Sequence, residues 1–120
     1  MYIFARKLTY MGVVKTDMYT DEVKATASYF KVLGHPARIR ILIYLSKRDS
    51  CVCGDIVQEI GLAQSTISQH LKVLKDAGFI QGSIEGASVC YCINADEWNK
   101  CNELIQSFGN QLATNAIKCC

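Results

Sequence analysis

The sequence of 120 residues lacks the marks of several large classes of protein. No stretch approaches the roughly 18 consecutive apolar residues that a membrane-spanning helix needs, so we expect no contact with a membrane. Residues 1–7 contain no continuous apolar stretch and no convincing cleavage site, so a secretory signal is not expected either. Together these absences predict a cytoplasmic protein.

Strong charge and catalytic patterns are also missing. The net charge of +2 excludes a histone-like or strongly basic tail protein, but it allows DNA binding through one local face. No Ser/His/Asp set, phosphate-binding loop or pair of carboxylates is apparent. The sequence also has no Cys-x-x-Cys in a βαβ context, which a thiol oxidoreductase usually needs. We therefore expect neither an enzyme nor an organic cofactor.

Cysteine, by contrast, is abundant, with seven residues in this short chain. The odd count and the close pairs argue against the disulfide framework of a secreted protein. In a reducing cytosol, clustered thiols more often indicate metal or metalloid binding, or redox sensing. The clusters are Cys51-Val-Cys53, Cys90-Tyr-Cys92 and Cys119-Cys120, and Cys101 stands alone.

Residues 64–78 form the most informative stretch. Apolar side chains recur with the spacing of one helix face, and Gly78 follows as a helix stop. The other face is polar and suits DNA, because glutamine can pair with adenine, hydroxyls with most base edges, and lysine with guanine or phosphate. The apolar residues are Ile67, Leu71, Leu74 and Ala77, and the polar ones are Gln64, Ser65, Thr66, Ser68, Gln69, His70 and Lys72. An ordinary solvated helix would look similar, so the surroundings must decide.

Two helices are predicted after residue 20. Asp21 suits the N-cap of the first, and Pro36 suits the first turn of the second, which spans 36–46. The first has an apolar stripe at Val23, Ala27, Phe30 and Leu33. The second has Ile39, Leu42, Ile43 and Leu45 as expected core, with Arg38 and Arg40 exposed.

A helix-turn-helix is predicted next. A short strand at 51–53 precedes a brief helix at 55–60, which Gly61 ends before the polar helix begins. Two short helices joined by a tight turn that contains glycine are typical of this motif. Because Ala63 is a poor N-cap, Ser65 is the better candidate to begin the second helix.

Residues 79–93 alternate as a β-hairpin whose turn, 85–87, has Gly86 at its tip. After a helix-turn-helix, such a hairpin is a wing. A last helix follows, capped by Asn94 or Asp96, with an apolar stripe at Trp98, Cys101, Ile105, Phe108 and Leu112. We expect the first and last helices to form a dimer interface; the alternative is an intramolecular core. Residues 1–20 are expected to be an arm or a first turn packed on a partner subunit, and 113–120 a tail.

This order of elements, together with two motifs, resembles the ArsR/SmtB family of bacterial metal-sensing repressors over residues 21–112. The motifs are Leu33-Gly-His-Pro-Ala-Arg-Ile-Arg-Ile-Leu42 and Ser65-Thr-Ile-Ser-Gln-His-Leu-Lys-Val-Leu-Lys-Asp-Ala-Gly78. The resemblance implies a mainly helical (α+β) winged helix-turn-helix homodimer that binds an inverted-repeat operator in double-stranded DNA and releases it when an effector binds. It places the polar residues Gln64 to His70 at DNA-reading positions, Lys72 near phosphate, and Gly86 and Ser88 near the minor groove.

The same resemblance assigns a role to Cys51 and Cys53. They look like the family's Cys-Val-Cys thiolate site, which binds trivalent arsenic or antimony, or soft divalent metals in relatives. Arsenite takes three sulfurs, and many arsenic sensors carry a third cysteine shortly after the pair. Here the next residues are Gly54, Asp55, Ile56 and Val57, so that ligand is missing.

The expected fold offers a substitute ligand. In a winged helix, the strand before the helix-turn-helix normally pairs with the second wing strand, which would place Cys51 and Cys53 beside Cys90 and Cys92. We predict that Cys51 or Cys53, together with Cys90 or Cys92, contributes to one sulfur cluster at the base of the wing. Cys90 and Cys92 fit small apolar strand residues equally well, Cys101 fits the core better than a ligand site, and Cys119 and Cys120 are alternative ligands.

The leading prediction is an arsenic- or antimony-responsive repressor. The alternatives are a repressor that senses thiol oxidation or persulfide, and a sensor of cadmium, lead or zinc. A zinc or nickel site on the last helix is not expected, because residues 96–120 contain no histidine.

Overall fold

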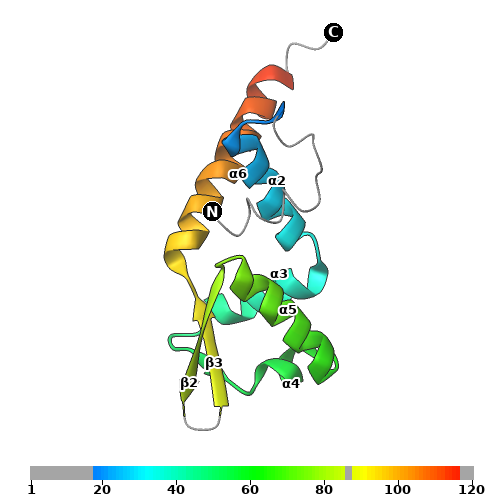
Figure 1. The fold of residues 1–120 in the computed structure, drawn as a ribbon, viewed down its shortest axis with the longest axis vertical. Helices are drawn as coiled ribbons and strands as arrows, with labels where there is room; N and C mark the ends of the chain where they lie inside the picture. Colours follow the sequence, from blue (N-terminus) through cyan, green and yellow to red (C-terminus); the bar gives the residue numbers. More distant parts are fainter. Residues whose placement is uncertain (1–17, 86–87, 117–120) are drawn as a thin grey trace. The chain divides into compact units, whose positions relative to one another are not determined.

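The computed structural model describes residues 18–85 and 88–116, which form five helices and three strands. These elements are α2 (Asp21–Leu33), α3 (Pro36–Ser46), β1 (Val52–Cys53), α4 (Ile56–Ile60), α5 (Gln64–Asp76), β2 (Ile80–Glu85), β3 (Ser88–Ile93) and α6 (Ala95–Ala116) (Figure 1). The chain divides into two compact units. One unit is Lys31–Ala95, and the other combines the chain up to Phe30 with the chain from Asp96 onward. Helices with one small antiparallel sheet confirm the predicted winged helix-turn-helix.

The sheet of the Lys31–Ala95 unit has the strand order β1-β3-β2, with both pairs antiparallel. Val52 lies opposite Tyr91, and Cys53 lies opposite Cys90. The predicted pairing of the strand before the helix-turn-helix with the second wing strand is therefore confirmed. Because β3 is the central strand, it connects the wing hairpin to the segment that leads into α4.

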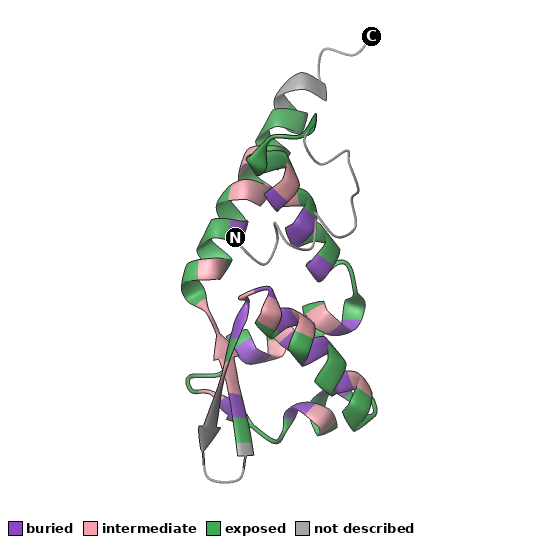
Figure 2. Cartoon of the chain, viewed as in Figure 1, coloured by how far each residue is buried: buried purple, intermediate pink, exposed green. Residues whose placement is uncertain are grey.

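Helix α5 buries the predicted apolar stripe, with Ile67, Leu71, Leu74 and Ala77 all in the core (Figure 2). The helix ends as the sequence predicts. Gly78 adopts φ of +88°, a left-handed conformation that glycine reaches without steric cost, and its N–H donates to the carbonyl of Lys75. The expected start is wrong: Ala63, and not Ser65, is the N-cap, and it supplies no side-chain cap.

Helix α3 differs from the prediction in which face it buries. Its buried residues are Ala37, Ile41 and Leu45, which follow one another at intervals of four. Ile39 and Ile43 were expected in the core, but they are 39% and 49% exposed because they lie on another face of the helix. The small Ala37 carries the inner stripe instead, which a search for large apolar residues overlooks.

Two arginines of α3 donate hydrogen bonds to backbone carbonyls of neighbouring helices. Arg40 donates to the carbonyls of Glu59 and Ile60 at 2.9 and 3.2 Å, which satisfies acceptors at the C-terminal end of α4. Arg38 donates from Nη1 to the carbonyl of Val32 at 3.0 Å. These contacts join α3 to α4 and to the end of α2 inside one unit.

A pair of histidines joins α3 to α5. His35 is the N-cap of α3, and its Nδ1 accepts from the N–H of Ala37 at 3.1 Å. His70 of α5 is only 8% exposed, and its ring lies 4.3 Å from the ring of His35. Arg38 Nε donates to His70 Nδ1 at 3.3 Å, which pairs the neutral ring with the guanidinium. This cluster fixes the rotation of the recognition helix α5 on α3.

In the second unit, α2 packs on α6 through a part-buried hydrogen bond and an aromatic contact. The hydroxyl of Tyr29 donates to Glu97 Oε2 at 2.6 Å, and the rings of Phe30 and Phe108 meet edge to face. Cys101 is fully buried, as expected of a core residue, and burial followed by the charge of Glu97 raises its pKa to about 11. No described helix has the length and apolarity to cross a membrane.

The start and the buried face of α2, and the end of α6, differ from the prediction. The hydroxyl oxygen of Thr20 accepts from the N–H of Val23, so Thr20, and not Asp21, caps α2. Val23 and Phe30 of the expected stripe are exposed, and the buried residues of α2 are Ala25, Ser28, Tyr29 and Val32. Helix α6 continues past Leu112 to Ala116, so the expected tail does not begin at residue 113.

Acid should loosen the histidine cluster. The pKa of His70 is lowered by burial, then by His35 and by the charge of Arg38, so protonation opposes the folded state. A histidine whose pKa is lower in the folded than in the unfolded protein makes the protein less stable as the pH falls below the unfolded pKa of about 6.5. We therefore expect the free energy of unfolding to decrease between pH 7.5 and pH 5, as measured by urea denaturation at steps in this range. The decrease should be smaller in His70→Gln. An unchanged decrease in the variant would contradict the assignment.

Candidate DNA-binding face and thiol site

The outer face of α5 presents most of the polar side chains that the sequence predicts for DNA. Gln64, Ser65, Ser68, Gln69 and Lys72 are exposed, and Thr66 is half-buried. The N-cap residue of α5, Ala63, accepts no hydrogen bond through its side chain from the N–H groups of the first helical turn. A helix N-terminus of this kind can hold a phosphate through its N–H groups and its dipole.

His70 is an exception, because the expectation that it lies on the outer face is wrong. It sits one position before Leu71 on the inner side of α5 and contacts His35 and Arg38. In sequence, a histidine beside glutamine looks like part of the polar face. The signal that could have separated it is its spacing of three from Ile67 and four from Leu74, which are both core positions.

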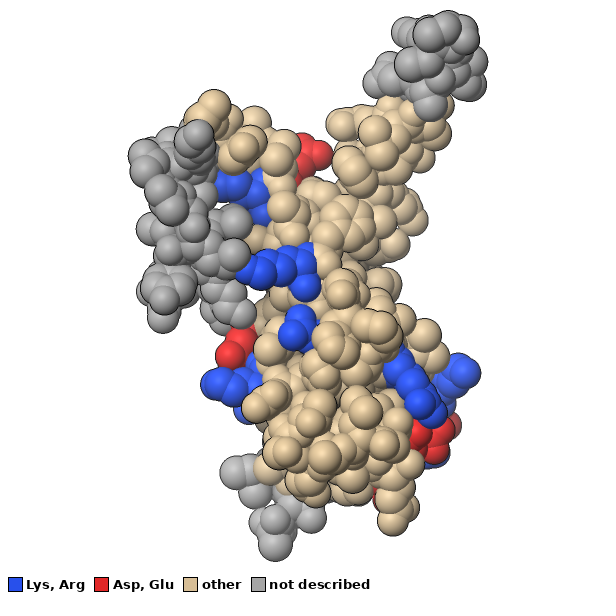
Figure 3. Space-filling view, turned by 90° about the vertical axis from the view of Figure 1, so that its right-hand side faces the viewer, with Lys and Arg blue, Asp and Glu red and all other residues tan. Residues whose placement is uncertain are grey.

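Lys72 remains free to reach a phosphate. Its Nζ lies 3.6 Å from Asp76 Oδ2, but the lysine side chain is 77% exposed. Exposed pairs of this kind contribute little, about 0–1 kcal/mol, so the ion pair does not fix the lysine. On the face shown in Figure 3, Lys and Arg gather in several separate groups, with acidic side chains beside some of them.

The wing contains a close contact that the sequence prediction missed. A Cβ at Gly82 would lie 3.2 Å from Tyr91 Cε1 and 3.3 Å from Lys75 Nζ. Glycine therefore lets the Tyr91 ring and the end of α5 approach the β2 backbone, and glycine inside a strand is the available signal for such an approach. Gly86 lies outside the described residues, and Ser88 opens β3 opposite Glu85.

A cavity separates part of the wing from the helix-turn-helix. It has a volume of about 360 Å³ and is open to solvent on one side. Its lining includes Gly54 from the β1–α4 connection, Ile56 of α4, Gln64 and Ser68 of α5, and Val89 and Tyr91 of β3. The wing and the recognition helix are therefore not fully packed against each other.

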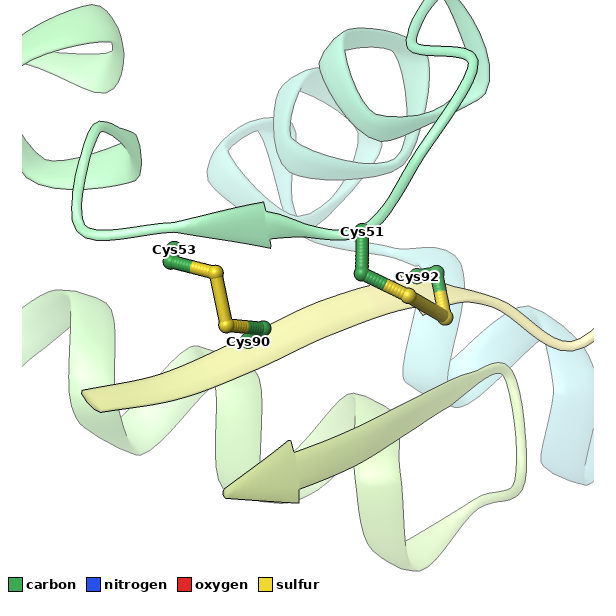
Figure 4. Close-up of a disulfide and its surroundings, with 4 residues drawn as sticks. All are labelled: Cys51, Cys53, Cys90 and Cys92. Atoms are coloured by element: carbon green, nitrogen blue, oxygen red, sulfur yellow. A yellow bond between two sulfur atoms is a disulfide. The ribbon is translucent and has the colours of Figure 1, made fainter. Parts of the chain in front are cut away.

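Four cysteines face one another across β1 and β3 (Figure 4). Disulfides join Cys51 to Cys92 and Cys53 to Cys90, with Cα–Cα distances of 4.5 and 4.2 Å. Residues two apart on a strand share a face, so both pairs lie on the same side of the sheet, while Val52 and Tyr91 between them point to the other side. The predicted placement of the two Cys-x-Cys motifs side by side is confirmed.

The four cysteine residues differ in their exposure to solvent. Cys53 is exposed, Cys51 and Cys92 are half-buried, and Cys90 is fully buried. With the sulfurs joined in pairs, the described residues contain no group of three or more His, Cys, Asp or Glu side chains arranged to hold a metal ion. Cys119 and Cys120, the alternative ligands, lie outside the described residues.

Comparison with known proteins gives the same assignment as the fold. Residues 35–81, which contain α3 and the helix-turn-helix, match the family described as "Bacterial regulatory protein, arsR family". The HTH-type transcriptional regulator MJ1325 of Methanocaldococcus jannaschii is 36% identical over 86 residues, which cover 71% of this chain and 96% of MJ1325.

Two further relatives are informative. The regulator Rv0081 of Mycobacterium tuberculosis is 42% identical over 74 residues, which cover 62% of this chain and 65% of Rv0081. Its crystal structure superposes with a TM-score of 0.55 and 35% identity over 78% of this chain and 96% of that one. The arsenical resistance operon repressor of Bacillus subtilis is 37% identical over 71 residues, 58% of this chain and 67% of that protein.

The fold, the exposed polar face of α5 and these similarities agree. DNA binding and homodimerisation are typical of the winged helix-turn-helix proteins in this group, and the group includes sensors of metals and metalloids. The chain belongs to the ArsR/SmtB family and is a DNA-binding transcriptional regulator, not an enzyme.

Proposed function

We propose that this regulator is a cytoplasmic repressor that releases its operator when the thiolates of Cys51, Cys53, Cys90 and Cys92 bind trivalent arsenic or antimony. The observation that carries the proposal is the register of β1 on β3, which places the two Cys-x-Cys motifs opposite each other. In the reduced protein, Cys51 and Cys53 supply two sulfurs, and Cys90 or Cys92 supplies the third that a pyramidal arsenic site needs. Soft thiolates favour soft ions of this kind.

The position of the thiols explains how binding would reach the DNA. Strand β1 continues through Gly54 and Asp55 into α4, and β3 is the central strand of the wing. An ion held by both strands fixes their separation, so it changes the position of the wing relative to α4 and α5. The cavity beside Gly54 and Tyr91 leaves room for this movement.

A repressor that senses thiol oxidation or persulfide is the second candidate, and one observation favours it. The strand register places the four cysteines in two facing pairs, so disulfide formation needs no further ligand. In this case the disulfides, and not an ion, would set the distance between β1 and β3. Both candidates use the same cysteines and the same route to the DNA.

We further propose that the repressor is a homodimer that uses α2 and α6. Large apolar side chains on these two helices remain exposed in the single chain, namely Val23, Phe30, Trp98, Phe108 and Leu112. Burying them against a second copy would remove an apolar surface from water. A twofold dimer presents two copies of α5, which fits an inverted-repeat operator.

Replacing a glutamine of the recognition helix should weaken operator binding. Good bidentate contacts between a side chain and a base are worth about 1–3 kcal/mol, so Gln69→Ala should bind roughly tenfold more weakly or worse. Fluorescence anisotropy with a labelled operator measures the affinity. Gln81→Ala is the matched control, because Gln81 is an exposed glutamine of β2 outside this face. Equal affinities of the two variants would show that α5 does not read the operator through Gln69.

One titration separates the candidate effectors. The reduced protein bound to operator is titrated with arsenite, with cadmium, lead or zinc, and with peroxide or polysulfide, while operator release is recorded. We expect arsenite to release the wild type and to fail with the double variant Cys90→Ser/Cys92→Ser. Cys119→Ser/Cys120→Ser is the control and should respond as the wild type does.

The other outcomes are equally specific. Release by oxidants alone would replace the arsenic proposal with the redox candidate, and release by a divalent ion alone would make the protein a sensor of that metal. Normal release of Cys90→Ser/Cys92→Ser by arsenite would exclude β3 as the source of the third sulfur.

A further inference from the structure

The two disulfides differ in how a reactant in solution can reach them. In the Cys53–Cys90 pair, Cys53 is exposed and Cys90 is 0% exposed. In the Cys51–Cys92 pair, both residues are half-buried. Only the first pair therefore joins an exposed cysteine residue to a fully buried one.

Exchange between thiols and disulfides depends strongly on this access. The attacking thiolate must meet the sulfur atom that it attacks. The exposure of Cys53 and the burial of Cys90 therefore direct a small molecule to Cys53 and away from Cys90. Cys90 still lies opposite Cys53 in the strand register, with a Cα–Cα distance of 4.2 Å, so it can react with Cys53 from inside the fold.

We propose that Cys53 is a site of reversible S-thiolation by low-molecular-weight thiols such as glutathione, and that Cys90 is the residue that resolves the adduct. The proposal rests on the redox candidate for the function of this protein, and it specifies the chemical partner and the order of events. It makes Cys53 the entry point of the signal and assigns Cys51 and Cys92 no part in the first step.

The reaction balances in two steps. The Cys53 thiolate attacks an oxidised thiol, R–S–S–R, so a bond forms between Cys53 Sγ and one R–S sulfur while the R–S–S–R bond breaks and R–S⁻ leaves. The Cys90 thiolate then attacks Cys53 Sγ, which forms the Cys53–Cys90 bond and expels the second R–S⁻. Two protein thiols are oxidised, one small disulfide is reduced, and the two departing thiolates take up the two protons. Excess reduced thiol drives both steps backward.

Trapping the intermediate tests this order. The reduced full-length protein is incubated with oxidised glutathione, quenched in acid and mapped by peptide mass spectrometry. Without its resolving partner, Cys90→Ser should accumulate glutathione on Cys53. The reciprocal variant Cys53→Ser should carry less on Cys90, by a factor on the order of ten, because Cys90 is buried. The wild type should show little adduct and proceed to the Cys53–Cys90 disulfide.

A second variant guards against disruption of the core. Cys90→Ala keeps an apolar side chain at the buried position and should give the same adduct on Cys53, with circular dichroism as the check on folding. Equal labelling of the two cysteines in the reciprocal variants, or no labelling of Cys53 in either Cys90 variant, would overturn the proposal. The adduct map needs no DNA, so its failure is distinct from a failure of oxidants to release the operator.

Discussion

The antiparallel pairing of β1 with β3 is the contact on which the rest of the functional structure depends. It involves only two residues of β1, yet it connects the segment before the helix-turn-helix to the central strand of the wing. Its register puts two pairs of cysteines directly opposite each other on one face of the sheet. Under the proposed function, a chemical change at those sulfurs would act on both parts of the protein that we expect to contact DNA.

The recognition helix α5 is held in place by contacts that do not involve the pairing of β1 with β3. Its apolar stripe packs into the core, while His70, His35 and Arg38 fix it to α3. Between the helix and the wing, by contrast, a cavity remains. Under the proposed function, this cavity would leave room for the wing to shift while α5 keeps its packing on α3.

Much of this arrangement could be predicted from the sequence, because it depends on local patterns. The apolar spacing of α5, the glycines at 61 and 78 and the alternation of the hairpin each specify an element through its own residues. The place of Cys51 and Cys53 beside Cys90 and Cys92 could also be predicted, because a winged helix-turn-helix pairs the two strands that carry them. The predictions that were wrong concern residues whose burial depends on contacts between elements. His70 is buried because α3 lies beside it, and Ile39 and Ile43 are exposed because another face of α3 meets its neighbours.

The strand register determines which cysteines meet. The decisive measurement is to map the disulfides of the oxidised full-length chain after digestion at acidic pH, which prevents exchange. We expect linked peptides that join Cys51 to Cys92 and Cys53 to Cys90. Links within a motif, such as Cys51 to Cys53, or links from these four cysteines to Cys119 or Cys120, would contradict it.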